Sequence, residues 1–184
     1  HNLLNALAAV AVAGTLGAKP QAIAAAMPGF RGVRRRMEVF LESRGMIFVD
    51  DFAHHPTAIR ETIAAARGRW PDRRLRVLFE PRSNTTVTNR FQAELTEAFA
   101  QADEVWLGPI HRANRIADAE RLDREAMSAE LKKRGIETYC REDAARMAGE
   151  VLAGGRAGDL VLIMSNGAFG GIYRKFRELP GDGS

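Results

Sequence analysis

Apolar side chains follow two different spacings along the chain. In residues 2–13 and 19–27 they cover a broad face at helical spacing, and Gly14 and Gly17 follow the first of these segments. Pro20 stands where the first turn of the second helix is expected. Further along, short runs rich in Val, Leu and Ile alternate with longer segments of helical spacing. This pattern predicts strands at residues 37–41, 46–49, 75–79, 104–107 and 160–164, and helices at residues 56–67, 88–100, 124–134 and 142–152.

Strands that alternate with helices indicate crossover connections and a mainly parallel sheet. The first two predicted strands are separated by Ser43, Arg44 and Gly45, which is typical of a strand pair joined by a turn. The expected fold class is therefore α/β, with a Rossmann-like, mainly parallel sheet flanked by helices and a helical segment in front of it. We place the domain boundary at the Pro- and Gly-containing turn between them, with residues 1–30 before it and residues 31–184 after it.

The composition is that of a soluble globular protein. Of the 184 residues, 46% are hydrophobic and 27% are charged, and no apolar run approaches the roughly 20 residues that span a bilayer. The single cysteine, Cys140, excludes an internal disulfide and fits a reducing compartment, so we expect a cytoplasmic protein without membrane contact. Because the first residue is His1 rather than Met, we expect the chain to begin partway through a longer protein.

Arginines give the chain its basic balance. The net charge is +4 and the isoelectric point is about 9.7, with arginine clusters at residues 34–36 and 67–76. Guanidinium groups suit phosphate and carboxylate ligands as well as nucleic acid. Aromatic residues are not interleaved with these arginines, and the sequence shows no zinc-finger or basic-zipper spacing. We therefore expect no nucleic-acid partner.

Three polar stretches follow three of the predicted strands. They are residues 50–55, 80–86 and 165–171. Ligands of parallel α/β sheets bind beyond the carboxyl ends of the strands. We therefore expect the three stretches to converge on one rim of the sheet and to form the binding site there.

The first stretch, DDFAHHP, places two carboxylates and two imidazoles where a strand passes into a helix. A carboxylate such as Asp51 can hold ribose hydroxyls or a cation there, and an imidazole such as His54 can meet a carboxylate or a phosphate. The alternative is helix capping, because Asp is favoured near helix starts in any protein. A metal site is disfavoured, because adjacent histidines usually diverge and no third ligand has suitable spacing.

The other two stretches offer groups that bind anions. In FEPRSNT, Arg82 can clamp a carboxylate while Ser83 and Asn84 fix its orientation, although a solvated loop would have the same composition. SNGAFGG begins with Ser165 and Asn166, and its glycines allow the backbone to approach an anion at the start of a following helix. It is not a P-loop, because it lacks the Gly-Lys-Ser/Thr ending.

Two amides lie near the start of the chain. Asn2 and Asn5 are three residues apart and so share one helical face. Amides placed in this way can bind an adenine edge, and either can equally serve as a helix cap.

Taken in order, these stretches resemble the Mur ligase family over nearly the whole chain. HNLLNALAA resembles the helix that ends the family's central ATP-binding domain, and GVRRRMEVF with DDFAHHPTAI resembles the start of its carboxy-terminal domain. The resemblance assigns residues 1–30 to the former and residues 31–184 to the latter. It implies an ATP-dependent ligase that forms C–N bonds in peptidoglycan and binds magnesium mainly through its central domain.

Within the family, FEPRSNT and SNGAFGGIYRK are most similar to one group of ligases. This group joins UDP-N-acetylmuramate to the tripeptide L-Ala-γ-D-Glu-meso-diaminopimelate in cell-wall recycling. The alternative is the group that adds L-alanine. Its members show His-Arg-Tyr-Thr-Arg in place of residues 82–86 and a Gly-Ala-Gly-Asp type of loop in place of residues 166–169, and both differences favour the tripeptide.

The resemblance also implies roles for single residues, in an ATP site and in a peptide site. They are Asn5 at the adenine, Arg36 at the phosphates and Asp51 at the ribose, then His54 near the incoming amine, Arg82 with Ser83 and Asn84 at the diaminopimelate, and Ser165 and Asn166 in the wall of the peptide pocket.

The other parts of such an enzyme lie outside this sequence. The family carries a Gly-x-x-Gly-Lys-Thr motif in its central domain and its UDP-sugar site in its amino-terminal domain, and this chain has no such motif. We therefore expect the chain to be inactive alone. Its partners would be those two domains of the same bacterial parent, UDP-N-acetylmuramate and the murein tripeptide. The alternative from another class is a self-contained α/β module that binds a small acidic ligand or a protein.

Overall fold

The computed structural model describes residues 2–30 and 32–178. The chain divides into two compact units, His1–Arg34 and Arg35–Ser184. The division falls a few residues after the predicted boundary, whose residue Arg31, like His1, lies outside the described residues.

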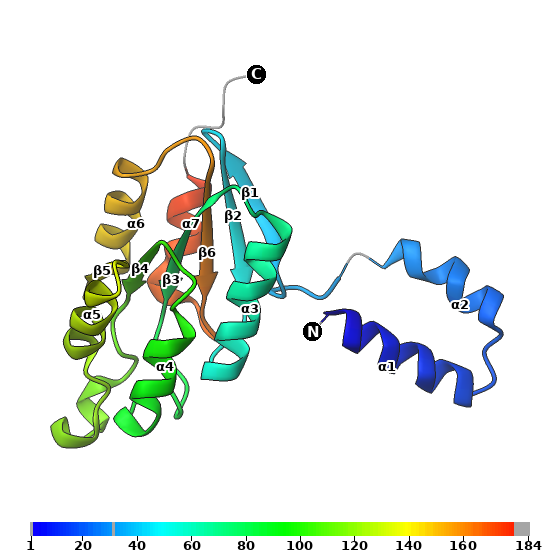
Figure 1. Ribbon diagram of the computed structural model, residues 1–184, viewed down its shortest axis with the longest axis horizontal. Coiled ribbons are helices and arrows are strands. Elements are labelled where there is room, and N and C mark those ends of the chain that lie inside the picture. The colour runs from blue at the N-terminus through cyan, green and yellow to red at the C-terminus, as the bar shows by residue number, and fades with distance from the viewer. Residues whose placement is uncertain (1, 31, 179–184) are drawn as a thin grey trace. The chain divides into compact units, whose positions relative to one another are not determined.

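The first unit contains two antiparallel helices, α1 Asn2–Thr15 and α2 Pro20–Ala26, and the 3₁₀ turn η1 Met27–Gly29 (Figure 1). Pro20 occupies the first position of α2, where its missing N–H has no helical partner to lose. Two short helices cannot bury all of their apolar side chains. Large ones remain exposed in this unit: Leu4, Leu7, Val12, Leu16, Met27, Phe30 and Val33.

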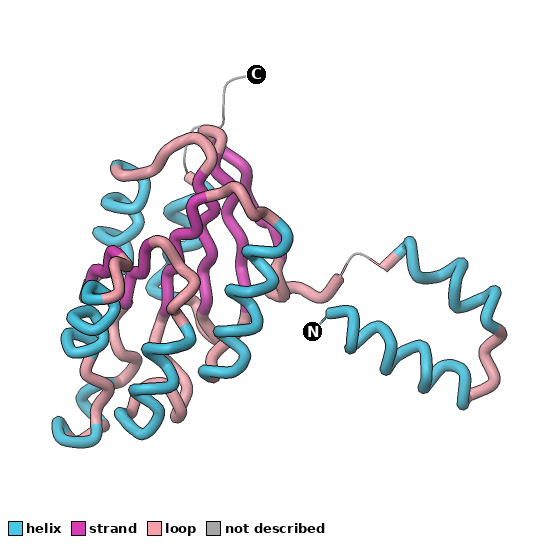
Figure 2. Tube along the Cα trace, viewed as in Figure 1, coloured by secondary structure: helices cyan, strands magenta, loops and turns pink. Residues whose placement is uncertain are grey.

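The second unit is a three-layer α/β/α fold (Figures 1 and 2). Its described strands are β1 Glu38–Ser43, β2 Met46–Asp51, β3 Arg74–Phe79, β4 Glu104–Leu107, β5 Glu137–Cys140 and β6 Asp159–Met164. Its described α-helices are α3 Pro56–Arg69, α4 Gln92–Ala98, α5 Arg124–Lys133, α6 Ala144–Ala153 and α7 Ile172–Arg177. Four 3₁₀ turns lie in the described loops: η2 Asn89–Phe91, η3 Ala113–Arg115, η4 Asp118–Glu120 and η5 Phe169–Gly171.

The strands form one sheet in the order β1-β2-β6-β3-β4-β5, and every neighbouring pair is parallel except β1 with β2. Alternate residues of β3 pack into two cores. Val77 and Phe79 meet the apolar side chains of α3, α4 and α5, whereas Leu78 meets those of α6 and α7. The prediction of a Rossmann-like, mainly parallel sheet flanked by helices is confirmed.

Local details differ from the prediction in two places. The turn between β1 and β2 consists of Arg44 and Gly45, both with positive φ (54° and 69°), while Ser43 pairs with Met46 inside the hairpin. Such two-residue turns match the twist of the adjoining strands. The edge strand β5, with the sequence ETYC, was not predicted, because four residues of which two are polar form no apolar run.

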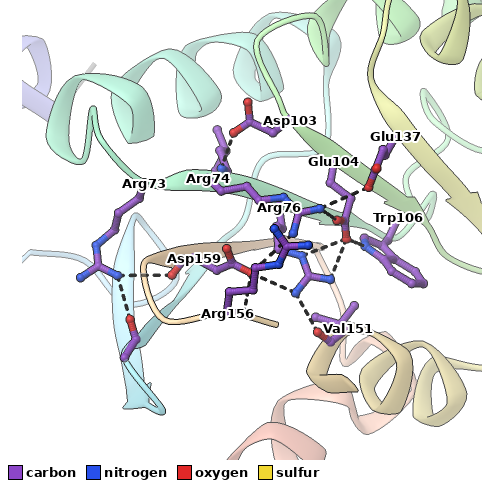
Figure 3. Close-up of polar contacts among 12 residues, drawn as sticks. Arg73, Arg74, Arg76, Asp103, Glu104, Trp106, Glu137, Val151, Arg156 and Asp159 are labelled. Carbon is purple, nitrogen blue, oxygen red and sulfur yellow. Dashed lines mark hydrogen bonds and ion pairs between the residues drawn. The ribbon is translucent and has the colours of Figure 1, made fainter. Parts of the chain in front are cut away.

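Charged residues gather where the parallel strands begin (Figure 3). This amino-end cluster consists of Arg74, Arg76, Glu104, Glu137 and Asp159. The side chain of Arg76 is only 1% exposed, and its guanidinium lies 2.7 Å from Glu104 and 3.3 Å from Asp159. It also donates to the carbonyl oxygen of Val151 at 2.7 Å. The cluster therefore joins β3, β4, β6 and α6 through charges that are satisfied inside the protein.

Candidate functional site

Three neighbouring strands end at the same level of the sheet. Asp51 of β2 pairs with Met164 of β6, and Met164 pairs with Phe79 of β3. Backbone hydrogen bonds continue beyond these ends: Ser165 N donates to Asp51 O at 3.2 Å, and Glu80 N donates to Met164 O at 3.1 Å. The predicted convergence of the three polar stretches on one rim is confirmed.

Asp51 lies below the surface of this rim and is fully buried. One of its carboxylate oxygens accepts from Ala53 N at 2.8 Å and from the Thr62 hydroxyl at 3.2 Å, and the other accepts from Met37 N at 2.9 Å. The carboxylate thus ties the end of β2 to α3 and to the segment before β1. A ribose could bind it only by replacing one of these partners, and its role in an ATP site stays a prediction.

Arg35 was not singled out by the sequence, yet it joins two of the three stretches. Its Nε lies 3.0 Å from an Asp50 carboxylate oxygen, and its Nη2 donates to Gly167 O at 3.0 Å and also to Ser165 O. The other oxygen of Asp50 accepts from the Tyr173 hydroxyl at 2.8 Å. Burial raises the pKa of Asp50, and these two donors oppose the rise. Arg35 and Asp50 therefore act together as a brace for the rim.

Arg36 and His54 both contact the aromatic ring of Phe52 at the rim. The exposed Arg36 guanidinium lies 5.7 Å from the centroid of the Phe52 ring, and the His54 ring meets Phe52 edge-on at 5.3 Å. His54 Nδ1 is 2.8 Å from Phe52 O, and a carbonyl only accepts, so Nδ1 carries a proton. In this tautomer Nε2 has no hydrogen, and its lone pair is free. Arg36 forms no hydrogen bond or ion pair with the described residues, so its charge is available to an anion.

His55, the second histidine of DDFAHHP, has a structural role. It is the N-cap of α3, where its ring accepts from Thr57 N at 3.4 Å, and Pro56 follows it at the first helical position. The capping that the sequence offered as an alternative for the aspartates is therefore performed by this histidine.

Arg82 is held on one side only. Its Nη1 lies 3.5 Å from a Glu80 carboxylate oxygen and 3.2 Å from His111 Nδ1. Because a guanidinium only donates, His111 Nδ1 must accept, and the imidazole is neutral. Burial and the neighbouring Arg82 charge lower the pKa of His111, in agreement with this arrangement. A third of the Arg82 side chain remains exposed (32%), which leaves donors for a ligand.

His111 was missed by the sequence analysis. It lies in the loop after β4, and its backbone N–H donates to Pro81 O at 2.9 Å, so a fourth loop joins the rim. The backbone also approaches the site closely at Gly167, where a methyl group would collide with the Arg82 guanidinium. A histidine a few residues beyond a predicted parallel strand was the only indication that the sequence offered.

The remaining predicted peptide-site residues differ in whether their side-chain polar atoms are free to bind a ligand. The hydroxyl of Ser83 donates to His54 O at 3.0 Å, and that of Ser165 is fully buried against Glu80 and accepts from Gly167 N at 2.9 Å. Both serines therefore shape the rim. Asn84 is exposed, and the buried Oδ1 atom of Asn166 has no hydrogen-bond partner among the described residues. These two amides are available for a ligand.

Asn5 belongs to the first unit, where it is exposed on α1, and its role at an adenine stays a prediction. Over residues 2–30 and 32–178, no group of three or more His, Cys, Asp or Glu side chains is placed to hold a metal ion. No helix in the same ranges has the length and apolar character needed to cross a membrane.

Comparison with known proteins shows which family the chain is similar to. The family model described as Mur ligase, glutamate ligase domain, matches residues 35–167. The chain belongs to the Mur ligase family. The match begins at Arg35, which is also the first residue of the second unit, so the three-layer fold is the Mur ligase carboxy-terminal domain.

Relatives of this Mur ligase domain are named for two different acceptors. A UDP-N-acetylmuramate–L-alanine ligase of Geotalea daltonii is 39% identical over 185 residues, covering 98% of this chain and 40% of the relative. A UDP-N-acetylmuramate–L-alanyl-γ-D-glutamyl-meso-2,6-diaminoheptandioate ligase of Escherichia coli is 38% identical over 181 residues, covering 97% and 37%. A solved murein peptide ligase of Psychrobacter arcticus matches with a TM-score of 0.71 at 29% identity, covering 98% and 38%. The chain spans about two-fifths of the length of the curated relatives that it matches.

Proposed function

We propose that this chain is the carboxy-terminal part of an ATP-dependent ligase that joins UDP-N-acetylmuramate to L-Ala-γ-D-Glu-meso-diaminopimelate during cell-wall recycling in the bacterial cytoplasm. The E. coli and P. arcticus relatives support this proposal through their names. The apolar side chains exposed on α1 support the further proposal that residues 1–30 are the end of a central ATP-binding domain. That domain would provide the magnesium site.

The residues of this chain would then serve the second half of the reaction. In such a ligase, ATP phosphorylates the muramate carboxylate, and the tripeptide amine displaces phosphate to form the amide. The attacking amine must lose a proton, and the free Nε2 of His54 is the base that the rim offers. The open guanidinium of Arg36, beside His54 on Phe52, suits the phosphate groups.

In this proposal, Arg82 determines the specificity for the tripeptide. Its guanidinium is fixed by Glu80 and His111 and keeps an exposed side toward the rim, which suits a peptide carboxylate. L-Alanine has one small carboxylate, whereas the tripeptide has several. The second candidate is the L-alanine ligase, which the name and 39% identity of the Geotalea daltonii relative favour.

A ligase assay on the intact parent protein tests both candidates. With UDP-N-acetylmuramate, ATP and magnesium, we expect ADP release to depend on the tripeptide and not on L-alanine. Release with L-alanine alone would make the parent an L-alanine ligase. Release with neither acceptor would favour a non-catalytic binding module. The 184-residue chain alone should release no ADP under the same conditions, because it has no Gly-x-x-Gly-Lys-Thr motif.

A further inference from the structure

A polar cavity of about 460 Å³ lies beside the rim, and Asn84 is the only residue of the sites above that lines it. We call it the rim cavity. The residues that matter for its chemistry are Asn84, Asn89, Arg90, Phe91 and Glu120. They come from the loop and 3₁₀ turn after β3 and from the η4 turn.

Hydrogen bonds hold the two walls of the rim cavity together. Thr88 pairs with Arg121 in an isolated antiparallel bridge, and Leu122 N donates to Val87 O at 3.0 Å. The side-chain amide of Asn89 donates to the backbone carbonyl oxygen of Ala119, the residue before Glu120, at 2.8 Å. The cavity is therefore built by long-range contacts rather than left by a loose loop.

Two opposite charges line this cavity. Arg90 and Glu120 are both exposed, and neither forms a hydrogen bond or ion pair through its side chain with the part of the chain that the structure describes. Nearby, Arg121 pairs with Asp118 at 2.6 Å, so acidic and basic neighbours in this segment do combine where they can reach each other. The rim cavity thus presents a separate cation and a separate anion, together with the free amide of Asn84.

Two contacts link the wall of the rim cavity to the histidines of DDFAHHP. Phe91, in its wall, lies 5.7 Å from the ring of His55, and Ser83, next to Asn84, donates to His54 O at 3.0 Å. A molecule whose amine reaches His54 can therefore extend along this loop toward Arg90.

We propose that the rim cavity binds the far end of the acceptor peptide through an amino-acid group that carries one carboxylate and one ammonium. Arg90 binds the carboxylate, Glu120 the ammonium, and Asn84 donates to the carboxylate. meso-Diaminopimelate ends in such a group, and L-alanine has no group beyond its own reacting amine and carboxylate. This inference rests on the proposed function, and it makes Arg90 and Glu120 residues that determine specificity.

The test uses the intact parent ligase and two acceptor tripeptides. One ends in meso-diaminopimelate, and the other ends in lysine, which keeps the ammonium and lacks the distal carboxylate. Arg90→Ala should raise KM for the diaminopimelate peptide about tenfold with little change in kcat, because a charged hydrogen bond far from the reacting amine is lost. KM for the lysine peptide should stay unchanged. Glu120→Gln should raise KM for both peptides, since both carry the ammonium.

Arg115→Ala is the matched control, because Arg115 is an exposed arginine in the neighbouring η3 turn and does not line the cavity. If Arg90→Ala affects both peptides equally, or neither, the rim cavity does not bind the distal carboxylate. If the wild-type ligase rejects the lysine peptide, the comparison of Arg90→Ala with Arg115→Ala on the diaminopimelate peptide decides. If the wild-type ligase uses no tripeptide at all, the proposed function itself is wrong, which separates the two failures.

Discussion

Arginines gather at both ends of the sheet, and they have different partners there. At the amino end, Arg76 is buried and its charge is met by Glu104, Asp159 and a carbonyl oxygen (Figure 3). At the carboxyl end, the side chains of Arg36 and Arg90 form no hydrogen bond or ion pair with the described residues, and Arg82 is held on one side only.

This difference separates stability from binding. A buried charge must be paired within the protein, because water cannot solvate it there. An unpaired charge at the rim remains hydrated until a ligand replaces the water, so it costs the free protein little. Arg35 lies between the two cases, since it is at the rim and yet pairs with Asp50. Position at the carboxyl ends of the strands is therefore not enough to make an arginine a ligand-binding residue.

The largest effect should follow from Arg76→Met, which removes the charge and keeps much of the side chain's length. Glu104 and Asp159 would remain buried without their main partner, and we expect the free energy of unfolding to fall by about 3–5 kcal/mol. Urea unfolding of the chain, followed by circular dichroism, measures this loss. Arg146→Ala is the control, because Arg146 pairs with Glu150 on the surface of α6. Similar losses in the two variants would contradict the comparison between the ends.

Asp51→Asn tests whether a buried carboxylate at the rim stabilises the fold, as the carboxylates of the amino-end cluster do. An asparagine amide cannot accept from Met37 N, Ala53 N and Thr62 together, because one of its two terminal atoms only donates. We expect a loss of about 1–3 kcal/mol in the free energy of unfolding, measured by the same urea titration. An unchanged midpoint together with weaker ATP use in the intact parent would make Asp51 a ligand residue instead.

Arg82→Ala should change function more than stability, because Arg82 is a third exposed and its buried partner Glu80 keeps the hydrogen bond from the Ser165 hydroxyl. In the intact parent we expect KM for the tripeptide to rise about tenfold or more, as for the loss of one charged hydrogen bond. Arg82→Lys should recover only part of this, since an ammonium lacks the planar fork of a guanidinium. An unchanged KM for the tripeptide would contradict the role assigned to Arg82.

The sequence could predict the central strands and the rim, because both depend on local pattern. β2, β3 and β6 carry apolar runs, and each is followed by polar residues. Contacts between distant residues could not be predicted. The arginines at 67–76 suit phosphate or carboxylate ligands by composition, but Arg76 pairs with Glu104 and Asp159, which are 28 and 83 residues away along the chain.

The same limit applies to the candidate site. His54 and Arg82 stand in recognisable motifs, whereas Arg35 and His111 gain their positions from long-range packing. The buried state of Asp51 depends on Thr62 and Met37, which the sequence does not place beside it. A single sequence shows which residues can bind a ligand, and the fold determines which of them already have partners within the protein.

The smallest effect should be a pH effect at His111, and it tests whether Arg82 is held as described. Burial, and then the charge of Arg82, lower the pKa of His111 below its ordinary value of about 6.5. The stability that comes from keeping this ring neutral is present above that value and is lost as the pH falls through the lowered pKa, because the unfolded chain binds the proton more readily. Arg82→Ala removes the second cause, so an NMR titration should show the pKa of His111 rising toward its ordinary value. Arg90→Ala, which removes an arginine outside this contact, should leave it unchanged, and a His111 pKa that is insensitive to Arg82 would mean that the guanidinium is not fixed by this histidine.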